Sequence, residues 1–437
     1  MSGKPVSKPL RILYVTGPGD IIGTYRYWEK QQDDPAQVSV TYSGQFYDVC
    51  QNLGATGYAI ATQPKKAVYK AENFILEHRP RPLIHARGLL YHLGLVWYGL
   101  GILISALRWR IDLAVVANGT MHWFMLLLMP LLGIKVVPSL HCVLWLKHQP
   151  IKKSQRILLA LDRYLFQKST AILAVSAEIL QQVATVIPAS QRLSQVNTPK
   201  LVEFLPLYRA HEFNDVQPVN FHRQPFRVLF VGRIERDKGI FDLLQMAEQL
   251  VLQGRYPIHF DVCGIGSDLD ELQQSVKVLG LEAAFTCHGY CQKVQLRRLF
   301  SQSHVVIAPT TTRFVEGFCK VVAEGILVGR PVLTSRVCPA LSYVRPGVVE
   351  VEPDNVPQYI EALLKLYQDR DFYQQKLQGC LTVQSPFYDR RRSWGYQLEQ
   401  VIRQAFATEA CYQAPARLIA PNQIDSTVTV ETGSSFK

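Results

Sequence analysis

Residues 304–335, HVVIAPTTTRFVEGFCKVVAEGILVGRPVLTS, follow the order strand, loop, helix, strand. The short apolar runs His304–Pro309 and Pro331–Ser335 are typical of strands that are buried on both faces of a parallel sheet. Between them, Cys319–Val328 carries apolar residues at helical spacing, and Gly329 ends the predicted helix. The stretch therefore predicts a strand-helix-strand unit, the repeating element of an α/β fold.

Two carboxylates flank the start of this predicted helix. Glu316 lies just before the helix, and Glu324 lies inside it, eight positions later. Between them, the backbone N–H groups of Gly317, Phe318 and Cys319 would lie at the positive end of the helix dipole, where free amides bind anions. Carboxylates accept hydrogen bonds from hydroxyl groups. The combination predicts a nucleotide-sugar site, with phosphate on the amides and sugar or ribose hydroxyls on the carboxylates.

The length and the charge distribution of the chain indicate its number of domains and the kind of partner it binds. At 437 residues the chain is too long for one core, which predicts two domains. Residues 1–210 contain 23 Lys and Arg against 11 Asp and Glu, whereas the remainder is balanced. This excess predicts an anionic partner such as a membrane surface, a phosphorylated lipid or nucleic acid; a solvated basic face without a partner is the alternative.

The nine cysteines include no CxxC pair, which favours buried thiols over a metal site. The first residues show no signal peptide pattern, and both features fit a reducing cytoplasm.

The first strand is expected at Leu10–Thr16, and a glycine-rich turn with Gly17, Gly19 and Gly23 follows it and opens a helix at Thr24–Lys30. A dinucleotide site would need an acidic residue at the end of the next strand. We expect that strand at Val38–Tyr42, and the first acid after it is Asp48. The turn could equally serve another ligand that needs close backbone approach, or be purely structural.

A long apolar segment, Leu89–Leu107, has nineteen residues without a formal charge and is long enough to span a membrane. However, predicted strands at Leu83–Ala86 and Leu113–Ala117 would belong to one sheet, and a spanning helix would separate their ends across a bilayer. We therefore interpret the segment as a crossover helix, either simply buried or also in contact with a membrane surface. Arg87 and Arg108-Trp109-Arg110 are flanks typical of an interfacial helix.

Further elements alternate along the chain. We expect helices at His122–Leu132 and Ile151–Lys168 and a strand at Lys135–Ser139. His141 follows that strand at its carboxyl end, where α/β sheets bind ligands. The connection between the domains is predicted near Pro206–Pro225.

The second half repeats this pattern from the strand Arg227–Val231 onward. In the next loop, Arg233 and Lys238 could neutralise a diphosphate, or could simply pair with acidic neighbours in solvent. Asp268-Leu269-Asp270 resembles a metal-binding pair, but its place at a predicted helix start favours capping.

Five motifs occur in order: Val231-Gly232-Arg233 with Lys238-Gly239, Gly264-Ile265-Gly266-Ser267, His288-Gly289, Glu316-Gly317-Phe318 with Glu324, and Gly329-Arg330-Pro331-Val332. Together they resemble the retaining glycosyltransferases of the GT-B fold, glycosyltransferase family 4. The resemblance implies two Rossmann-like domains facing across a cleft: residues 1–210 for the acceptor, and 226–388 for the nucleotide sugar. It also implies that a final helix at 391–406 crosses back onto the first domain, and residues 408–437 are expected to form a flexible tail.

The resemblance implies a role for each site residue. Arg233 and Lys238 would hold the donor diphosphate beside Gly232, Gly264 and Gly266. Glu316 with the amides of Gly317, Phe318 and Cys319 would bind the transferred sugar, and His141 would touch it. Glu324 would bind the ribose, His288 and Gly289 would line the nucleobase, and Gly17, Gly19 and Gly23 would close over the donor. Cys319 departs from the family pattern, where a glycine is usual.

The expected function is retaining transfer of a sugar from a UDP- or GDP-linked donor, without metal or cofactor, because the cations of the loop replace the acid that a glycosidase needs. The expected acceptor is a glycan or lipid-linked molecule at the cytoplasmic face of the membrane, with no nucleic acid partner. One alternative is a non-catalytic protein that binds sugar nucleotides or glycans. A Rossmann oxidoreductase is the other, and it would leave Glu316, Glu324, Arg233 and Lys238 without a role.

Overall fold

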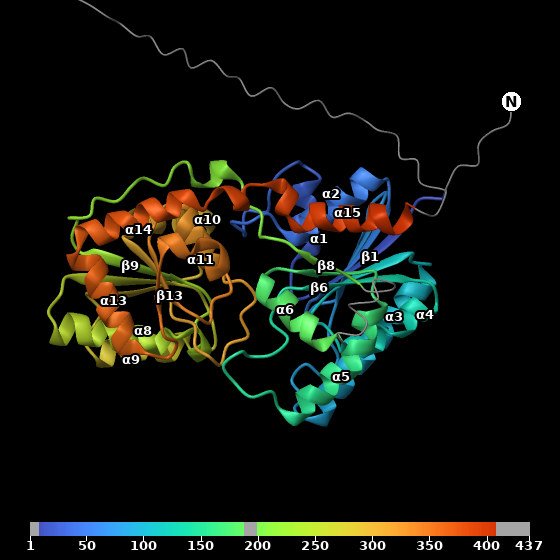
Figure 1. Cartoon of the computed structure of the whole chain (residues 1–437), viewed down its shortest axis with the longest axis horizontal. Helices are drawn as coiled ribbons and strands as arrows, with labels where there is room; N and C mark the ends of the chain where they lie inside the picture. Colours follow the sequence, from blue (N-terminus) through green and yellow to red (C-terminus); the bar gives the residue numbers. More distant parts are fainter. Residues whose placement is uncertain (1–7, 188–198, 408–437) are drawn as a thin grey trace, which may run out of the picture.

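Each half of the chain forms its own sheet, and the two sheets lie in separate lobes (Figure 1). The computed structural model describes residues 8–187 and 199–407. The first sheet has the strand order β3-β4-β2-β1-β5-β6-β7-β8, and only the β3–β4 pair is antiparallel. Its strands are β1 (Arg11–Thr16), β2 (Thr56–Thr62), β3 (Ala67–Lys70), β4 (Phe74–Arg79), β5 (Leu113–Ala117), β6 (Lys135–Leu140), β7 (Ala171–Ala174) and β8 (Lys200–Glu203).

The second sheet is wholly parallel, in the order β11-β10-β9-β12-β13-β14. Its strands are β9 (Phe226–Val231), β10 (Ile258–Cys263), β11 (Phe285–Gly289), β12 (Val305–Ala308), β13 (Val332–Ser335) and β14 (Val348–Val351). In both sheets the strand order reverses beside the first strand, β1 or β9, and such a reversal opens a crevice at the carboxyl ends of the strands.

Helices cover both faces of the sheets, as Figure 1 shows for α2 and α15 on one side of the first sheet and α5 on the other. The α-helices are α1 (Ile21–Trp28), α2 (Tyr42–Leu53), α3 (Leu89–Arg108), α4 (Leu128–Leu131), α5 (Lys153–Lys168), α6 (Ala177–Val186), α8 (Ile240–Ala247), α9 (Leu269–Val278), α10 (Lys293–Gln302), α11 (Lys320–Leu327), α12 (Leu341–Val344), α13 (Val356–Gln368), α14 (Arg370–Thr382) and α15 (Trp394–Phe406).

The inner strands are continuous apolar runs because both of their faces are covered. Every residue of β5 (LAVVA), β7 (AILA) and β12 (VVIA) is buried. The predicted unit at residues 304–335 is present as β12, α11 and β13, with boundaries within two residues of expectation.

The chain crosses between the lobes twice, and the two crossings lie side by side. On the way out, the N–H groups of Leu205 and Tyr208 donate to the carbonyls of Arg392 and Phe387 at 2.8 and 3.0 Å. On the way back, the last helix α15 packs against α2 of the first lobe, where the N–H of Gly395 donates to the side chain of Gln45 at 2.8 Å. The predicted helix 391–406 is in fact α15 preceded by a 3₁₀ turn at Arg390–Arg392.

The prediction of a strand at Val38–Tyr42 is wrong. Tyr42 is the first residue of α2, and the hydroxyl of Thr41 caps this helix by accepting the N–H of Gly44 at 3.1 Å. The second strand is β2, which also lacks an acidic residue at its end. The argument against a dinucleotide site therefore holds with the corrected strand.

The prediction of a strand at Leu83–Ala86 is also wrong, because this segment is a turn that follows the Arg-Pro-Arg-Pro sequence. Its place is taken by β4, which lies in the same sheet as β5. Since α3 joins these two strands, it is the crossover helix. By length and composition α3 could cross a membrane, and 44% of its apolar window is buried in the protein.

Smaller boundaries also differ from expectation. α1 begins at Ile21, three residues earlier than predicted, because Asp20 caps it through the N–H of Gly23. The predicted helix His122–Leu132 is a 3₁₀ turn at Trp123–Leu126 followed by the short α4. The segment 408–437 lies outside the described residues.

Candidate active site

A cavity of about 700 Å³ lies where the two lobes meet, and both lobes line it. The first lobe contributes Ala36, Gln37, His141 and Cys142, and the second contributes Val231, Gly232, Arg233, Lys238, Cys263, Gly264, Ile265, Tyr290, Cys291, Leu296, Phe314, Val315, Glu316, Gly317, Cys319, Lys320 and Val321. These residues come mainly from the carboxyl ends of strands and the loops that follow, where α/β folds bind ligands. Eight of the predicted site residues meet here: His141, Gly232, Arg233, Lys238, Gly264, Glu316, Gly317 and Cys319.

Lys238 and Glu316 form the charged centre of this cavity. The ammonium of Lys238 donates to Oε2 of Glu316 at 2.6 Å, and both side chains are largely buried. Burial opposes the charge of Lys238, but the neighbouring carboxylate outweighs it and raises the pKa of the ammonium group. Lys238 is therefore a fixed cation on the cavity wall.

Two of the three amides expected to be free before α11, those of Gly317 and Cys319, already have an acceptor. Oε1 of Glu316 accepts the N–H of Gly317 at 3.2 Å and that of Cys319 at 3.1 Å. Glu316 precedes the helix by only a few residues, so its side chain reaches back and satisfies these donors locally. A phosphate that binds these amides must displace this carboxylate.

Arg233 lies at the rim of the cavity, beside Lys238. Its guanidinium is bound to Glu235 at 3.0 Å and is 60% exposed, so this ion pair is weak. Both cations lie over the ring of Phe314, with Nζ of Lys238 at 3.8 Å and the guanidinium carbon at 5.1 Å from its centroid. Phe314 was not predicted as a site residue; the only signal was an aromatic residue in an otherwise polar loop.

Gly317 lies where the second lobe touches the first. A Cβ atom at this position would lie 1.7 Å from the carbonyl oxygen of His141. Only a residue without a side chain allows this approach of two backbones. Two positions later, Cys319 has a φ of 68°, a left-handed conformation that costs a non-glycine residue free energy. The glycine that the family usually has here would avoid that cost.

His141 is held from behind by the last helix of the chain. Oγ of Ser139 accepts the indole N–H of Trp394 at 2.8 Å and lies 2.9 Å from Nε2 of His141. The Ser139 hydroxyl has one O–H and two lone pairs, so it can donate to Nε2 or accept from it, and the tautomer of His141 follows from which of the two occurs. Nδ1 is buried and has no hydrogen-bond partner among the described residues. Burial, and then the charge of Lys320, lower the pKa of His141 to about 3, so the ring is neutral.

Lys320 is a cavity residue that the sequence motifs did not indicate. Its ammonium donates to the hydroxyl of Ser39 at 2.9 Å and lies 5.0 Å from the ring centroid of Tyr42. Burial lowers its pKa, and Glu324, one helical turn further along α11, partly opposes this. Lys320 therefore joins α11 to the first lobe beside His141.

The glycine loops of the second lobe pack against one another. A Cβ at Gly264 would lie 1.7 Å from the carbonyl oxygen of Gly232, and one at Gly266 would lie 2.2 Å from that of Ile234. Gly264 lines the cavity, whereas Gly266 faces the backbone of Ile234. These glycines therefore set the spacing of the two loops that form one cavity wall.

Other predicted site residues lie away from the cavity lining in the described structure. Phe318 packs on Tyr343 and Phe387, with ring centroids 5.6 and 6.1 Å apart. The carboxylate of Glu324 is buried and accepts the hydroxyl of Tyr208 at 3.4 Å. A ribose that binds Glu324 would have to compete with this hydroxyl.

His288, predicted beside the nucleobase, bonds instead to the buried Asp261 at 2.8 Å. The adjacent Gly289 accepts the N–H of Gly264 through its carbonyl at 2.8 Å. In the first lobe, the turn with Gly17, Gly19 and Gly23 leads from β1 into α1 and does not contribute to the cavity lining of the described chain.

Asp268 is the N-cap residue of α9, at the helix start where capping was predicted. Its carboxylate, however, accepts the N–H of Arg236 at 2.8 Å and makes no side-chain hydrogen bond to α9 within the described chain.

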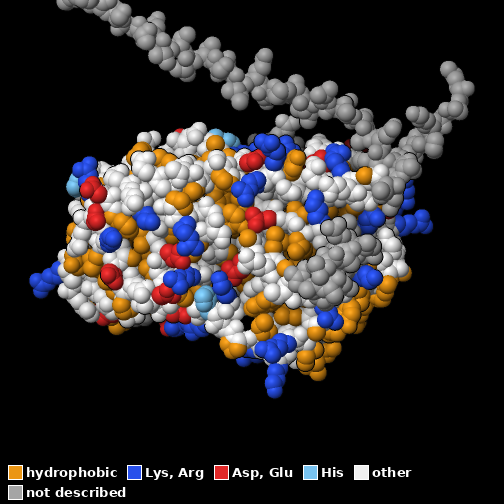
Figure 2. Space-filling view, in the orientation of Figure 1, with side chains coloured by type: hydrophobic (Ala, Val, Ile, Leu, Met, Phe, Trp, Pro, Cys, Tyr) orange, Lys and Arg blue, Asp and Glu red, His pale blue; other side chains and the backbone are white. Residues whose placement is uncertain are grey.

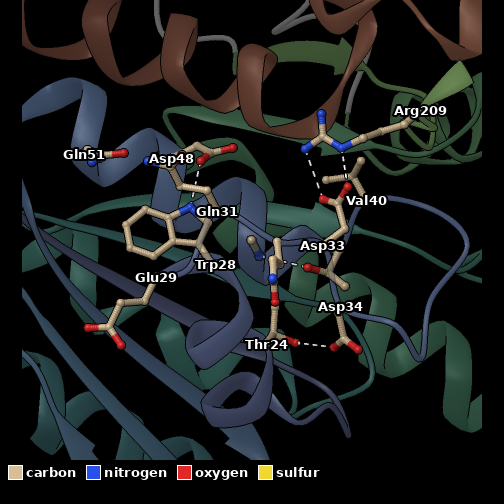
Figure 3. Close-up of a pocket in the computed structure, with 13 residues that line it drawn as sticks. Thr24, Trp28, Glu29, Gln31, Asp33, Asp34, Val40, Asp48, Gln51 and Arg209 are labelled. Carbon is tan, nitrogen blue, oxygen red and sulfur yellow. Dashed lines mark hydrogen bonds and ion pairs between the residues drawn. The ribbon is translucent and has the colours of Figure 1, made fainter. Parts of the chain in front are cut away.

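A second cavity, of about 410 Å³, lies in the first lobe beside α1 and α2 (Figure 3). Several of its polar side chains are paired: Nε1 of Trp28 donates to Asp48 and the hydroxyl of Thr24 donates to Asp34, both at 2.8 Å. Arg209 forms an ion pair with Asp33. These pairs join α1 to α2, and the segment after α1 to both α1 and the linker between the lobes, which is a structural role.

Two family descriptions match the chain: "Glycosyltransferase Family 4" over residues 46–196 and "Glycosyl transferases group 1" over residues 212–378. The two Rossmann-like lobes, with a cavity between them, have the GT-B fold. The chain belongs to glycosyltransferase family 4.

Two relatives from Streptomyces are glycosyltransferases. The 2-deoxystreptamine N-acetyl-D-glucosaminyltransferase of Streptomyces fradiae is 23% identical over 51% of this chain, and the match covers 54% of its own length. The alpha-D-kanosaminyltransferase of Streptomyces kanamyceticus is 20% identical over 66% of this chain and 75% of its own. The chain thus spans about half the length of the first relative.

Solved structures share the fold across the whole molecule. Sucrose-phosphate synthase from Thermosynechococcus elongatus has a TM-score of 0.64 at 16% identity, covering 91% of this chain and 99% of its own. HepE of Anabaena, solved in complex with UDP, has a TM-score of 0.60 at 14% identity and covers 91% of this chain and 100% of its own. At these identities the likeness shows the fold.

Proposed function

We propose that this glycosyltransferase transfers a sugar from a UDP- or GDP-linked donor, with retention of configuration and without a metal. The acceptor is a glycan or a lipid-linked precursor of a polysaccharide, and the protein acts in the cytoplasm at the inner face of the cell membrane. One observation supports the donor chemistry most strongly. Lys238, Glu316 and the amides of Gly317 and Cys319 meet on a single wall of the cavity between the lobes.

The residues at this wall match what a leaving diphosphate needs. When the bond between the sugar and the diphosphate breaks, the leaving group is a nucleoside diphosphate anion, so cations can replace the carboxylic acid of a glycosidase. Lys238 and Arg233 would stabilise the developing charge, each contributing about 3 kcal/mol by analogy with oxyanion-hole donors. In the free protein Lys238 is bound to Glu316. The donor phosphate would therefore compete for this ammonium and release Glu316 to accept sugar hydroxyls.

The opposite wall would orient the sugar. His141 is neutral. We propose that the Ser139 O–H donates to Nε2 and that Nδ1 carries the proton, so that Nδ1 would donate a hydrogen bond to a sugar oxygen and the ring would not act as an acid. Retention implies that the acceptor attacks on the face from which the diphosphate leaves. We propose that a phosphate oxygen takes the acceptor proton, since both would then lie on that face.

Turnover of radiolabelled UDP- and GDP-sugars tests the donor chemistry. We expect the wild type to release nucleoside diphosphate, and Lys238→Ala to lower kcat/KM by roughly 100-fold or more. The matched control is Lys277→Ala, an exposed lysine on α9 in the same lobe, which should leave turnover unchanged. Unaffected turnover in Lys238→Ala would remove its diphosphate role. Donor binding by thermal shift without turnover would instead indicate a non-catalytic binding protein.

A further inference from the structure

The crossover helix α3 has two apolar faces. One face packs on the sheet and includes Tyr98 and Ile102, both fully buried. The other face carries Leu93, Trp97, Leu100, Ile104 and Leu107, and these side chains are exposed, Trp97 by 71% and Ile104 by 63%. The positions alternate in steps of four and three residues, so they form one stripe along the helix. Surface helices normally place polar residues on this side.

Neighbouring elements extend this exposed stripe. On α4, Leu128 and Leu131 are exposed, and on α5 the exposed Ile157, Leu161 and Tyr164 again follow helical spacing. Of the 24 exposed large hydrophobic residues in the described chain, 15 lie between residues 83 and 164. Figure 2 shows hydrophobic side chains gathered at the lower right of the molecule, near α5, with lysine and arginine side chains among them. We call the exposed sides of α3, α4 and α5 the α3–α5 face.

The charge of this region is strongly one-sided. Residues 79–177 contain 12 Lys and Arg but only two acids. Asp162 is buried, and Asp112 accepts the backbone N–H of Arg11 at 2.8 Å. By contrast, Arg87 and Arg108 at the two ends of α3 and Lys153 on α5 are exposed. None of these three cations forms an ion pair within the described part of the chain. The apolar surface is therefore accompanied by cations without balancing anions.

This pattern fits a lipid bilayer with anionic headgroups better than a second copy of the chain. In a two-fold symmetric dimer a surface meets its own copy, so the basic residues would lie against basic residues. A bilayer offers both a hydrocarbon boundary for Trp97 and Ile104 and anionic headgroups for the cations. Spanning is excluded because the strands on either side of α3, β4 and β5, lie in one sheet.

We propose that the α3–α5 face docks onto the surface of an anionic lipid bilayer, with α3 lying in the plane of the interface. This inference rests on the proposed location at the membrane and on the proposed lipid-linked acceptor. It does not rest on the donor chemistry, because docking needs no donor. A docked first lobe would leave the cavity between the lobes accessible to a soluble donor. A lipid-linked acceptor would then reach the enzyme by diffusion in the bilayer.

Flotation of the full-length protein with vesicles, without any nucleotide sugar, tests the proposal. We expect strong binding to phosphatidylcholine vesicles that contain phosphatidylglycerol and weak binding to phosphatidylcholine alone. The double variant Trp97→Glu and Ile104→Glu should lower binding at least about tenfold, because two large apolar side chains leave the interface and two negative charges enter it. The matched control is Val278→Glu, whose valine is 75% exposed on α9 of the other lobe, and which should bind as the wild type does.

Tryptophan fluorescence gives a second readout that does not depend on a disruptive substitution. All six tryptophans lie in the described residues, and Trp97 is the only exposed one. Vesicles should therefore shift the emission to shorter wavelength, and Trp97→Phe should keep binding but lose the shift.

Absence of wild-type binding to both kinds of vesicle would overturn the proposal, as would equal binding by the double variant. The proposal would also be overturned if the wild type formed a dimer without binding vesicles, and if the double variant dissociated that dimer. Donor turnover measured without vesicles is independent of these results, so failure of docking and failure of the proposed chemistry can be told apart.

Discussion

At the scale of single residues, the site depends on hydrogen bonds between distant parts of the chain. Ser139 is the example: its hydroxyl contacts Trp394 from the last helix and His141 from the cavity wall. This one oxygen contacts both the first residue of α15 and the ring of His141. Loss of this hydroxyl should therefore affect both stability and the site.

Ser139→Ala should lower stability and activity together. The indole N–H of Trp394 would remain buried without a partner, which costs about 1–3 kcal/mol. Nε2 of His141 would also lose its contact with Ser139, on which the proposed tautomer depends. Urea unfolding measures the first effect, and the ring ¹⁵N chemical shifts of His141 measure the second.

The control for this substitution is Ser169→Ala, because Ser169 is also buried but its hydroxyl bonds only to the helix carbonyl of Leu165 within the described chain. It should leave transfer and the His141 shifts unchanged. Unaltered histidine shifts in Ser139→Ala would contradict the tautomer that we propose.

At the scale of elements, a buried carboxyl on α5 makes local packing depend on pH. Asp162 accepts the N–H of Phe124, and burial raises its pKa to about 7. The folded state thus holds this proton more tightly than the unfolded state, where the pKa is about 3.9. The contribution of Asp162 to stability is therefore greatest below about pH 4 and is lost as the pH rises through 7.

Asp162→Asn should remove this loss, because the amide keeps an acceptor oxygen for Phe124 and does not ionise. We expect the variant to be more stable than the wild type at pH 8, by up to about 4 kcal/mol if the full pKa difference applies. The two proteins should converge below pH 4. Thermal unfolding from pH 4 to pH 8 measures this difference, and a constant offset across the range would contradict the assignment.

The elements that the sequence predicted well are those whose burial is uniform. Runs such as those of β5 and β12 are apolar throughout because both faces are covered, and they were placed correctly. The hairpin β3–β4 was missed because it lies at the sheet edge, where β3 is largely exposed. At residues 38–42, a side-chain cap by Thr41 overrode a β-prone composition.

In the candidate site, too, the sequence predicted the residues of local motifs but not the contacts between distant residues. The motifs around Lys238 and Glu316 are local, so the sequence indicated both residues, and the structure brings them to one wall. The occupied amides of α11 were not foreseen, although Glu316 itself supplies the competing acceptor. Contacts such as that of Lys320 with Ser39 join residues far apart in the chain, and no local pattern encodes them.

At the scale of the whole molecule, the relative position of the two lobes depends on a contact of backbone with backbone. Gly317 at the start of α11 meets the carbonyl of His141, and no side chain separates them. Because His141 and Glu316 belong to opposite walls of the cavity, this contact also sets the distance between the two halves of the site. Closure of such a cavity excludes water from the donor.

Gly317→Ala should hold the lobes apart. The added methyl would lie 1.7 Å from the His141 oxygen, so either the lobes must separate or the loop at Glu316 must move. We expect transfer to fall by roughly tenfold or more, since small displacements of catalytic groups are costly. Small-angle X-ray scattering should show a larger radius of gyration for the variant.

The control is Gly101→Ala on α3, where the added carbon would meet only the end of the Arg79 side chain at 3.7 Å. This variant should leave both measurements unchanged. A variant at Gly317 with wild-type scattering and wild-type transfer would show that the lobes close without this contact.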